Sequence, residues 1–166
     1  GSPLLDVVRV GAAFVRAASV KRGLRGARIA VLPSPCRVIV STWVDELFLL
    51  ERFGVELAYV PVERYAAIAR DVAESDVADY VASLLGQFPV DGVTDAELFD
   101  SARMALAMVQ LVESMALSGV ALEDFNEDIY RVLGFRPHLM HPRLSALGCT
   151  VGLEADVLGV LATIVM

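Results

Sequence analysis

Short runs of apolar residues, many of them β-branched, recur along this chain and predict buried strands. They occupy residues 27–32, 55–60, 120–122 and 150–153. Pro33 ends the first run and Pro61 follows the second, as expected where a strand gives way to a loop. Continuous apolar runs of this length are typical of strands that are covered on both faces of a parallel sheet.

Outside these runs, apolar residues recur every three or four positions and predict helices. The predicted helices cover residues 4–20, 42–53, 62–73, 77–87, 94–117, 126–133 and a final segment after the last strand. Thr42 with Asp45, and Thr94 with Glu97, fit capping boxes, and Gly54 suits a helix end. Because strands that alternate with helices need crossover connections, the pattern predicts an α/β class: a helix-rich, Rossmann-like parallel sheet with helices on both faces.

The chain of 166 residues suits one domain. We expect residues 1–26 to form a leading helix and linker, in which Gly1-Ser2 resembles the scar of a removed tag, and residues 27–166 to form the Rossmann-like domain. The hydrophobic fraction of 56% exceeds the usual value of about 45–50% and predicts surface that is buried against a partner. The uncharged apolar run 157–166 is shorter than the roughly 20 residues of a membrane-spanning helix, so no membrane is expected.

The net charge of −7 argues against nucleic acid as a partner, because phosphate binding requires clustered Lys and Arg. A small neutral or cationic ligand suits this charge better. Cys36 and Cys149 have no spacing typical of zinc or of a disulfide framework, so a reducing cytoplasm is the expected location.

Two acidic pairs follow two of the predicted strands and are the first candidates for chemistry. Glu123 and Asp124 come after the third strand, and Glu154 and Asp156 come after the fourth. If these strands are neighbours, the carboxylates could converge at one edge of the sheet and hold Mg²⁺ or Mn²⁺. In the alternative interpretation, Asp124 and Asp156 cap helices and the glutamates are solvated.

Other candidates have plainer explanations beside the functional ones. His138 and His141 could bind a metal, but Pro142 disfavours a regular helix there and two surface histidines explain the pattern. Cys36 could be a nucleophile, although no histidine partner is recognisable. The loop 33–37 lacks the glycines of a phosphate-binding loop, which disfavours nucleotide binding. Trp43 could stack on a sugar ring or be a half-buried core residue.

A stripe of residues between 104 and 115 could be taken for a hydrophobic binding face. It consists of Met104, Ala107, Met108, Leu111 and Met115. At this helical spacing a core face is the expected interpretation.

Four blocks, taken in order, resemble the second domain of the L-fucose/L-arabinose isomerase family: residues 24–32, 42–47, 53–57 and 148–159. In that family the glutamate of the Glu-x-Asp segment is a ligand of the divalent metal, usually Mn²⁺, and a catalytic carboxylate. The resemblance implies both roles for Glu154, in an aldose–ketose isomerisation through an ene-diol. Leu153 and His138 stand where the family commonly has cysteines, so the substrate preference is not carried over.

The resemblance further implies that this chain is a central-domain fragment with a small sugar as substrate. The other metal ligands of the family have no counterpart in it, so isomerase turnover is not expected from the fragment alone. Mn²⁺ or Mg²⁺ is expected in the intact parent, together with the missing N- and C-terminal domains and a homo-oligomer. Asp156 is a second candidate ligand, and Trp43 and Glu123 are candidate substrate contacts. A non-catalytic assembly or sugar-binding module of the same fold, or a flavodoxin-like ligand-binding domain, are the alternatives.

Overall fold

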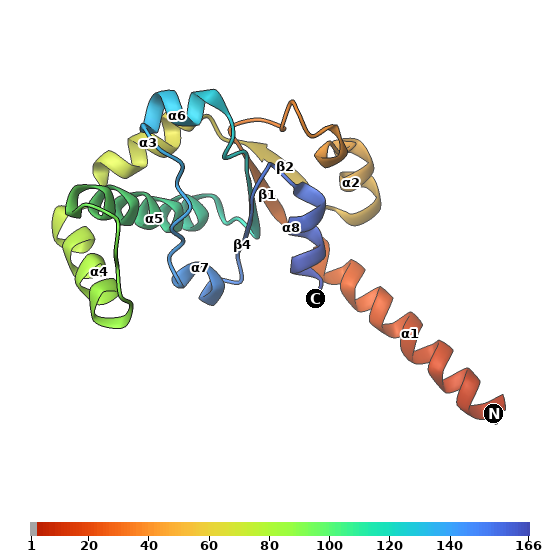
Figure 1. Ribbon diagram of the computed structural model, residues 1–166. Coiled ribbons are helices and arrows are strands. Elements are labelled where there is room, and N and C mark those ends of the chain that lie inside the picture. The colour runs from red at the N-terminus through yellow and green to blue at the C-terminus, as the bar shows by residue number, and fades with distance from the viewer. Residues whose placement is uncertain (1–2) are drawn as a thin grey trace.

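The computed structural model describes residues 3–166, with side chains from Val7 onward, so the interpretation of Gly1-Ser2 lies outside the described residues. Four strands form one parallel sheet in the order β2-β1-β3-β4 (Figure 1). The strands are β1 (Arg28–Leu32), β2 (Glu56–Tyr59), β3 (Gly119–Leu122) and β4 (Thr150–Gly152). Helices cover both faces, which confirms the predicted fold class.

One face of the sheet carries the larger hydrophobic core. Its helices are α3 (Val62–Asp71), α4 (Glu74–Gln87), α5 (Asp95–Met115), α6 (Glu127–Leu133) and the short α7 (Arg143–Ala146). Ala30 and Leu32 of β1 and Val120 and Leu122 of β3 point into this core. The methionine stripe of α5 packs here too, as expected, because Met104 and Met108 are buried and Met115 is partly buried.

The opposite face carries a smaller core made by three helices. These are α2 (Glu46–Phe53), α8 (Val157–Ile164) and the last turn of α1 (Pro3–Leu24). Ile29 and Val31 point into this core, so alternate residues of β1 serve the two faces as the period of a strand requires. Leu24, Leu49 and Val160 meet them from the helices.

Two glycines allow α8 to lie close against the sheet. A Cβ atom added to Gly119 of β3 would lie only 2.4 Å from Cγ1 of Val160, and one added to Gly152 of β4 would lie 2.8 Å from its Cγ2. Both distances are shorter than a van der Waals contact. The side chain of Val160 therefore occupies the space that these two positions leave free, and this packing fixes the start of α8 beside the end of β4.

The helix caps confirm two predicted boundaries and correct a third; in addition, α4 begins at Glu74 rather than at residue 77, and α1 runs on to Leu24 rather than ending at residue 20. Thr94 and Glu97 form the predicted capping box of α5, and Gly54 ends α2 with φ +71°. The prediction that Thr42 caps the second helix is wrong. Thr42 lies in a 3₁₀ turn, η1 (Val40–Thr42), and donates its hydroxyl to the carbonyl of Ile39. Asp45 is the N-cap, so α2 begins later than the sequence pattern indicated.

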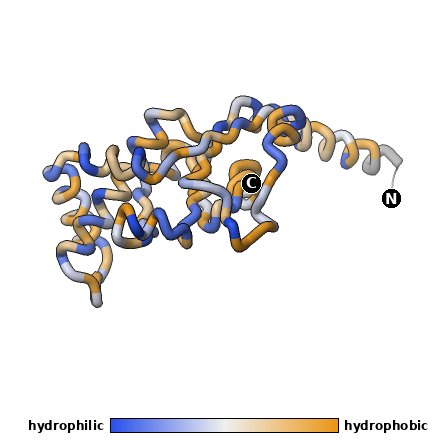
Figure 2. Tube along the Cα trace, turned by 90° about the horizontal axis from the view of Figure 1, so that it is seen from above, coloured by the Kyte–Doolittle hydropathy of each residue, from blue (hydrophilic) through white to orange (hydrophobic). Residues whose placement is uncertain are grey.

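Helix α1 projects away from the rest of the molecule (Figures 1 and 2). Its apolar side chains Val7, Val10 and Phe14 are exposed, Phe14 by 75%. At the base of α1, an apolar groove lies between α1, α2 and α8, with Leu24, Phe48 and Leu161 in its lining. Among the described residues, no helix combines the length and the hydropathy needed to cross a membrane.

Candidate functional site

The carboxyl ends of β3 and β4 lie side by side, because the two strands pair in parallel from Gly119 with Thr150 to Ala121 with Gly152. The condition under which the two acidic pairs could converge is therefore met. Glu123 and Asp124 follow β3, and Glu154 and Asp156 follow β4, at the same edge of the sheet. We refer to residues 153–156 as the Glu154 loop.

Asp124 does not cap a helix; it contacts both the Glu154 loop and His138. It is 2% exposed. Its Oδ1 accepts a hydrogen bond from the backbone N–H of Glu154 at 3.1 Å, and its Oδ2 lies 3.0 Å from Nε2 of His138. The expected alternative role of Asp124 as a helix cap is wrong, since Asn126 accepts the N-terminal N–H bond of α6. Asp124 thus holds two separate segments against the end of β3.

The backbone of the Glu154 loop is held in an unusual conformation. Glu154 has φ +58° and Ala155 has φ +52°, a left-handed region that residues with a Cβ atom seldom adopt. Two hydrogen bonds from β3 and its end fix it: Glu154 N–H to Asp124, and Ala155 N–H to the carbonyl of Leu122 at 3.0 Å. The Glu154 side chain is half-buried and lines none of the cavities described here.

Asp156 serves the helix that follows. Its Oδ1 accepts the backbone N–H of Gly159 at 2.9 Å, so Asp156 is the N-cap of α8 as the alternative interpretation predicted. Among the described residues, no three His, Cys, Asp or Glu side chains gather closely enough to hold a metal ion. Asp124 and Asp156 are thus both engaged by hydrogen bonds, whereas no hydrogen bond of the Glu154 carboxylate is found among the described residues.

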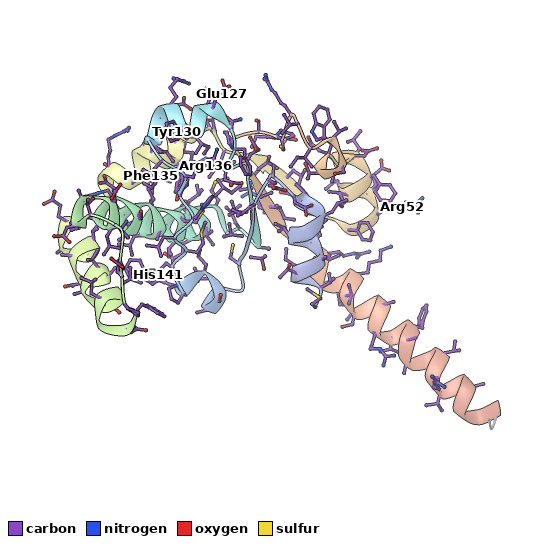
Figure 3. All side chains as sticks on the ribbon, viewed as in Figure 1. Arg52, Glu127, Tyr130, Phe135, Arg136 and His141 are labelled. Atoms are coloured by element: carbon purple, nitrogen blue, oxygen red, sulfur yellow. The ribbon has the colours of Figure 1, made fainter. Side chains whose placement is uncertain are left out.

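The two histidines that the sequence singled out do not converge. The ring of His138 contacts Asp124, as described above, whereas His141 stacks on Tyr80 of α4 with a centroid distance of 4.3 Å. Figure 3 shows His141 on the side of the molecule where α4 lies. Partial burial, and then the nearby charge of Arg143, lower the pKa of His141 below its usual value. The two rings thus have different neighbours, His138 the end of β3 and His141 the helix α4.

A second opening lies at the carboxyl ends of β1 and β3. In the sheet, β1 lies between β2 and β3. The connection after β1 leads to α2 on one face of the sheet, and the connection after β3 leads to α6 on the other face, so the two loops diverge. Such a topological switch point is where open α/β sheets commonly bind ligands. We call the resulting cavity of about 610 Å³ the switch cavity; Glu123 lines it together with Cys36 and Arg37 of the loop after β1.

Trp43 lies on the α2 side of the sheet and is more exposed than a half-buried core residue, at 54%. Its indole N–H donates to the carbonyl of Cys36 at 2.6 Å. Trp43 and Ala155 both line a small cavity of about 180 Å³ together with Tyr59. Partial burial, and then the hydrogen bond and the charge of Glu46, raise the pKa of Tyr59 to about 12. Trp43 is thus a neighbour of the Glu154 loop.

Sequence reasoning missed the pairing of Asp124 with His138 and with the Glu154 backbone. The one signal available was that both acidic pairs follow strands, which places Asp124 near Glu154 only if β3 and β4 are adjacent. It also missed the link between Asn126 and Ser34, whose side chains are joined by a hydrogen bond of 3.2 Å between the two loops of the switch cavity.

No known family model and no curated protein matches this chain.

Proposed function

We propose that this chain forms the sheet-bearing domain of a metal-dependent aldose–ketose isomerase of the L-fucose/L-arabinose type. In this proposal Glu154 is both a metal ligand and the carboxylate that moves a proton. The observation that carries it is the fixed position of Glu154: a strained loop at the end of β4, held by the buried Asp124. The resemblance of residues 148–159 to the family's Glu-x-Asp segment gives the reaction class.

Backbone strain supports a functional role for this loop. Left-handed residues other than glycine cost about 1–3 kcal/mol each and persist where the surrounding structure imposes them, often at functional sites. Two such residues, Glu154 and Ala155, stand in succession here. Two hydrogen bonds to the end of β3 hold this backbone conformation, and so fix the position of the Glu154 Cα at the sheet edge.

The proposed chemistry needs a carboxylate that is fixed in place and accessible to the substrate. General base catalysis requires a group that is within hydrogen-bonding distance of the proton it removes. Glu154 is half-buried and its side chain is not engaged in any hydrogen bond that we identify within the described part of the chain, so it could take a proton from one sugar carbon and return it to the next. A bound divalent ion supplies polarisation of the two substrate oxygens and stabilises the charge that develops on them.

Mn²⁺ or Mg²⁺ is the metal of this proposal, and the donor set of the described residues fits it only in part. Glu154 offers one hard oxygen ligand, and Asp156 is a poorer second ligand because its Oδ1 is already the cap of α8. The proposal therefore assigns the remaining ligands to residues other than those described here.

The proposed partners are a small sugar and further domains or subunits of the parent protein. The exposed apolar side chains of α1, and the groove at its base, are surface of the kind that is covered in an assembly. This observation also favours the second candidate function, a non-catalytic assembly module of the same fold. We propose the cytoplasm as the location, where Cys36 and Cys149 would stay reduced, as they are here.

The test is an isomerase assay of the intact parent protein with L-fucose, L-arabinose and related aldoses, with and without Mn²⁺. Glu154→Gln keeps the size of the side chain and removes its basicity, so kcat should fall by at least about 100-fold. Glu51→Gln, an exposed acid on α2, is the matched control and should retain the wild-type rate.

Equal rates for Glu154→Gln and the wild type would remove Glu154 from the mechanism. Absence of Mn²⁺-dependent turnover with every sugar, combined with self-association of the protein, would overturn the enzymatic proposal and support the assembly module.

A further inference from the structure

Glu123, a lining residue of the switch cavity, has one carboxylate oxygen that is buried without a hydrogen-bond donor among the described residues. This oxygen is Oε1, and the residue as a whole is only 4% exposed. Burying a charged oxygen without a donor is costly, because it loses its hydration and gains nothing in exchange. The neighbouring Asp124 is equally buried, yet both of its oxygens have partners. Of these two neighbouring acids, Glu123 is the one with an oxygen that lacks a donor among the described residues.

Other residues of the cavity lining define what could supply that donor. The acidic side chains of Glu63, Glu127 and Asp128 line it, against one basic side chain, Arg37. Asp128 is paired with Arg131 at 2.7 Å, so its charge is partly compensated. A lining with this excess of negative charge favours a cation over an anion or a neutral molecule.

The remaining lining residues suit an organic body rather than a bare ion. Pro33, Val62 and Phe125 offer apolar surface, while Ser34 and Asn126 offer polar atoms at one side. A hard divalent ion takes six or more oxygen ligands, whereas an ammonium group needs acceptors for three N–H donors. One buried carboxylate with a few polar neighbours fits the second requirement better.

We propose that the switch cavity binds a small organic cation whose primary ammonium group donates a hydrogen bond to Glu123. The volume of about 610 Å³ is within the usual range for small-molecule sites. This site is separate from the Glu154 loop, since it lies between β1 and β3 rather than beyond β4. The inference does not depend on the proposed isomerase function, and either can fail without the other.

The experiment measures binding of 1,4-diaminobutane to the chain by calorimetry and by NMR at about 0.15 M salt, a concentration that screens distant surface charges. The matched neutral probe is 1,4-butanediol, and MnCl₂ is the third probe. We expect the diamine to bind at least tenfold more tightly than the diol. Its shift changes should be centred on residues 33–38 and 123–128.

Glu123→Gln should weaken diamine binding at least tenfold, while Glu51→Gln, outside the cavity, should leave it unchanged. Val38→Arg is the second variant, because Val38 lines the cavity and is highly exposed, so that the substitution adds a positive charge with little effect on folding. It too should weaken diamine binding.

Three results would overturn the inference. These are equal affinity for the diamine and the diol, undiminished diamine binding by both Glu123→Gln and Val38→Arg, and binding of Mn²⁺ to this cavity in preference to the diamine. If Glu123→Gln fails to fold, Val38→Arg decides the question alone.

Discussion

Two consecutive acidic residues at the end of β3 are buried to a similar degree and yet belong to opposite kinds of site. Asp124 faces the end of β4, where the Glu154 backbone and His138 satisfy both of its oxygens. Glu123 lines the switch cavity toward β1, and its Oε1 is buried without a donor among the described residues. Between β3 and β4, the chain's own polar groups are bonded to one another and hold the Glu154 loop in place. The switch cavity between β1 and β3 stays open to a ligand.

The difference follows from the topology of the sheet. The loops after β3 and β4 lie next to each other, so polar groups of one can satisfy those of the other. The loops after β1 and β3 part at the switch point, where the connection from β1 turns toward β2. Parted loops leave a cavity, and a carboxylate that enters it must find its donor elsewhere.

The largest effect should come from removing Asp124. Asp124→Ala leaves the N–H of Glu154 and the ring of His138 without their acceptor and releases the strained loop. Hydrogen bonds to charged groups contribute about 1.5–3 kcal/mol each, so we expect the free energy of unfolding to fall by about 3 kcal/mol. Urea unfolding followed by circular dichroism measures it.

The control for this variant is Asp128→Ala, which removes an exposed carboxylate paired with Arg131. Exposed ion pairs contribute about 0–1 kcal/mol, so this control should change little. A loss below about 1 kcal/mol for Asp124→Ala would mean that the buried network does not hold the Glu154 loop.

The substitution of Glu123 should have the opposite sign. Glu123→Gln keeps the shape of the side chain and removes a carboxylate charge whose Oε1 is buried without a donor among the described residues. Because that charge opposes folding, we expect the free energy of unfolding without ligand to rise by about 1 kcal/mol, measured by the same urea titration. A loss of more than about 1 kcal/mol would show that Glu123 has a favourable partner in the folded chain and that the two sites do not differ.

The strands and helices that carry these acidic residues were predictable from the sequence, but the contacts between them were not. The strands before Pro33 and Pro61 and the capping box of Thr94 and Glu97 depend on neighbouring residues alone, and the structure confirms them. The start of α2 was misplaced because Thr42 and Asp45 are both suitable caps, and tertiary packing decides between them. Local signals thus locate elements to within a few residues.

The site required information that no local pattern contains. Asp124 meets a backbone group 30 positions away and a histidine 14 positions away, which depends on how β3, β4 and the segment before α7 are arranged. Glu154 and Ala155 are not residues that favour a left-handed backbone, so nothing in their identity indicated the conformation of the loop. The positions of the acidic pairs after strands were predictable, and their separate roles were not.

An effect of about the same size is expected from releasing the strain in the Glu154 loop. Glycine adopts positive φ without steric cost, so Glu154→Gly should raise the free energy of unfolding by about 1 kcal/mol, while it removes the carboxylate on which the proposed reaction depends. A gain in stability accompanied by a loss of function is the expected signature of strain kept at a functional site. Thermal and urea unfolding of the chain measure the first effect, and the isomerase assay of the intact parent measures the second.

Ala116 provides a matched control, because it is also left-handed, with φ +50°, at the exposed end of α5 and far from the acidic edge. Ala116→Gly should give a similar gain in stability and leave the isomerase activity of the parent unchanged. If Ala116→Gly stabilises the chain while Glu154→Gly destabilises it by more than about 1 kcal/mol, then the Glu154 side chain itself holds the loop. In that case Glu154 has a structural role, and the edge at β3 and β4 is not a reactive site.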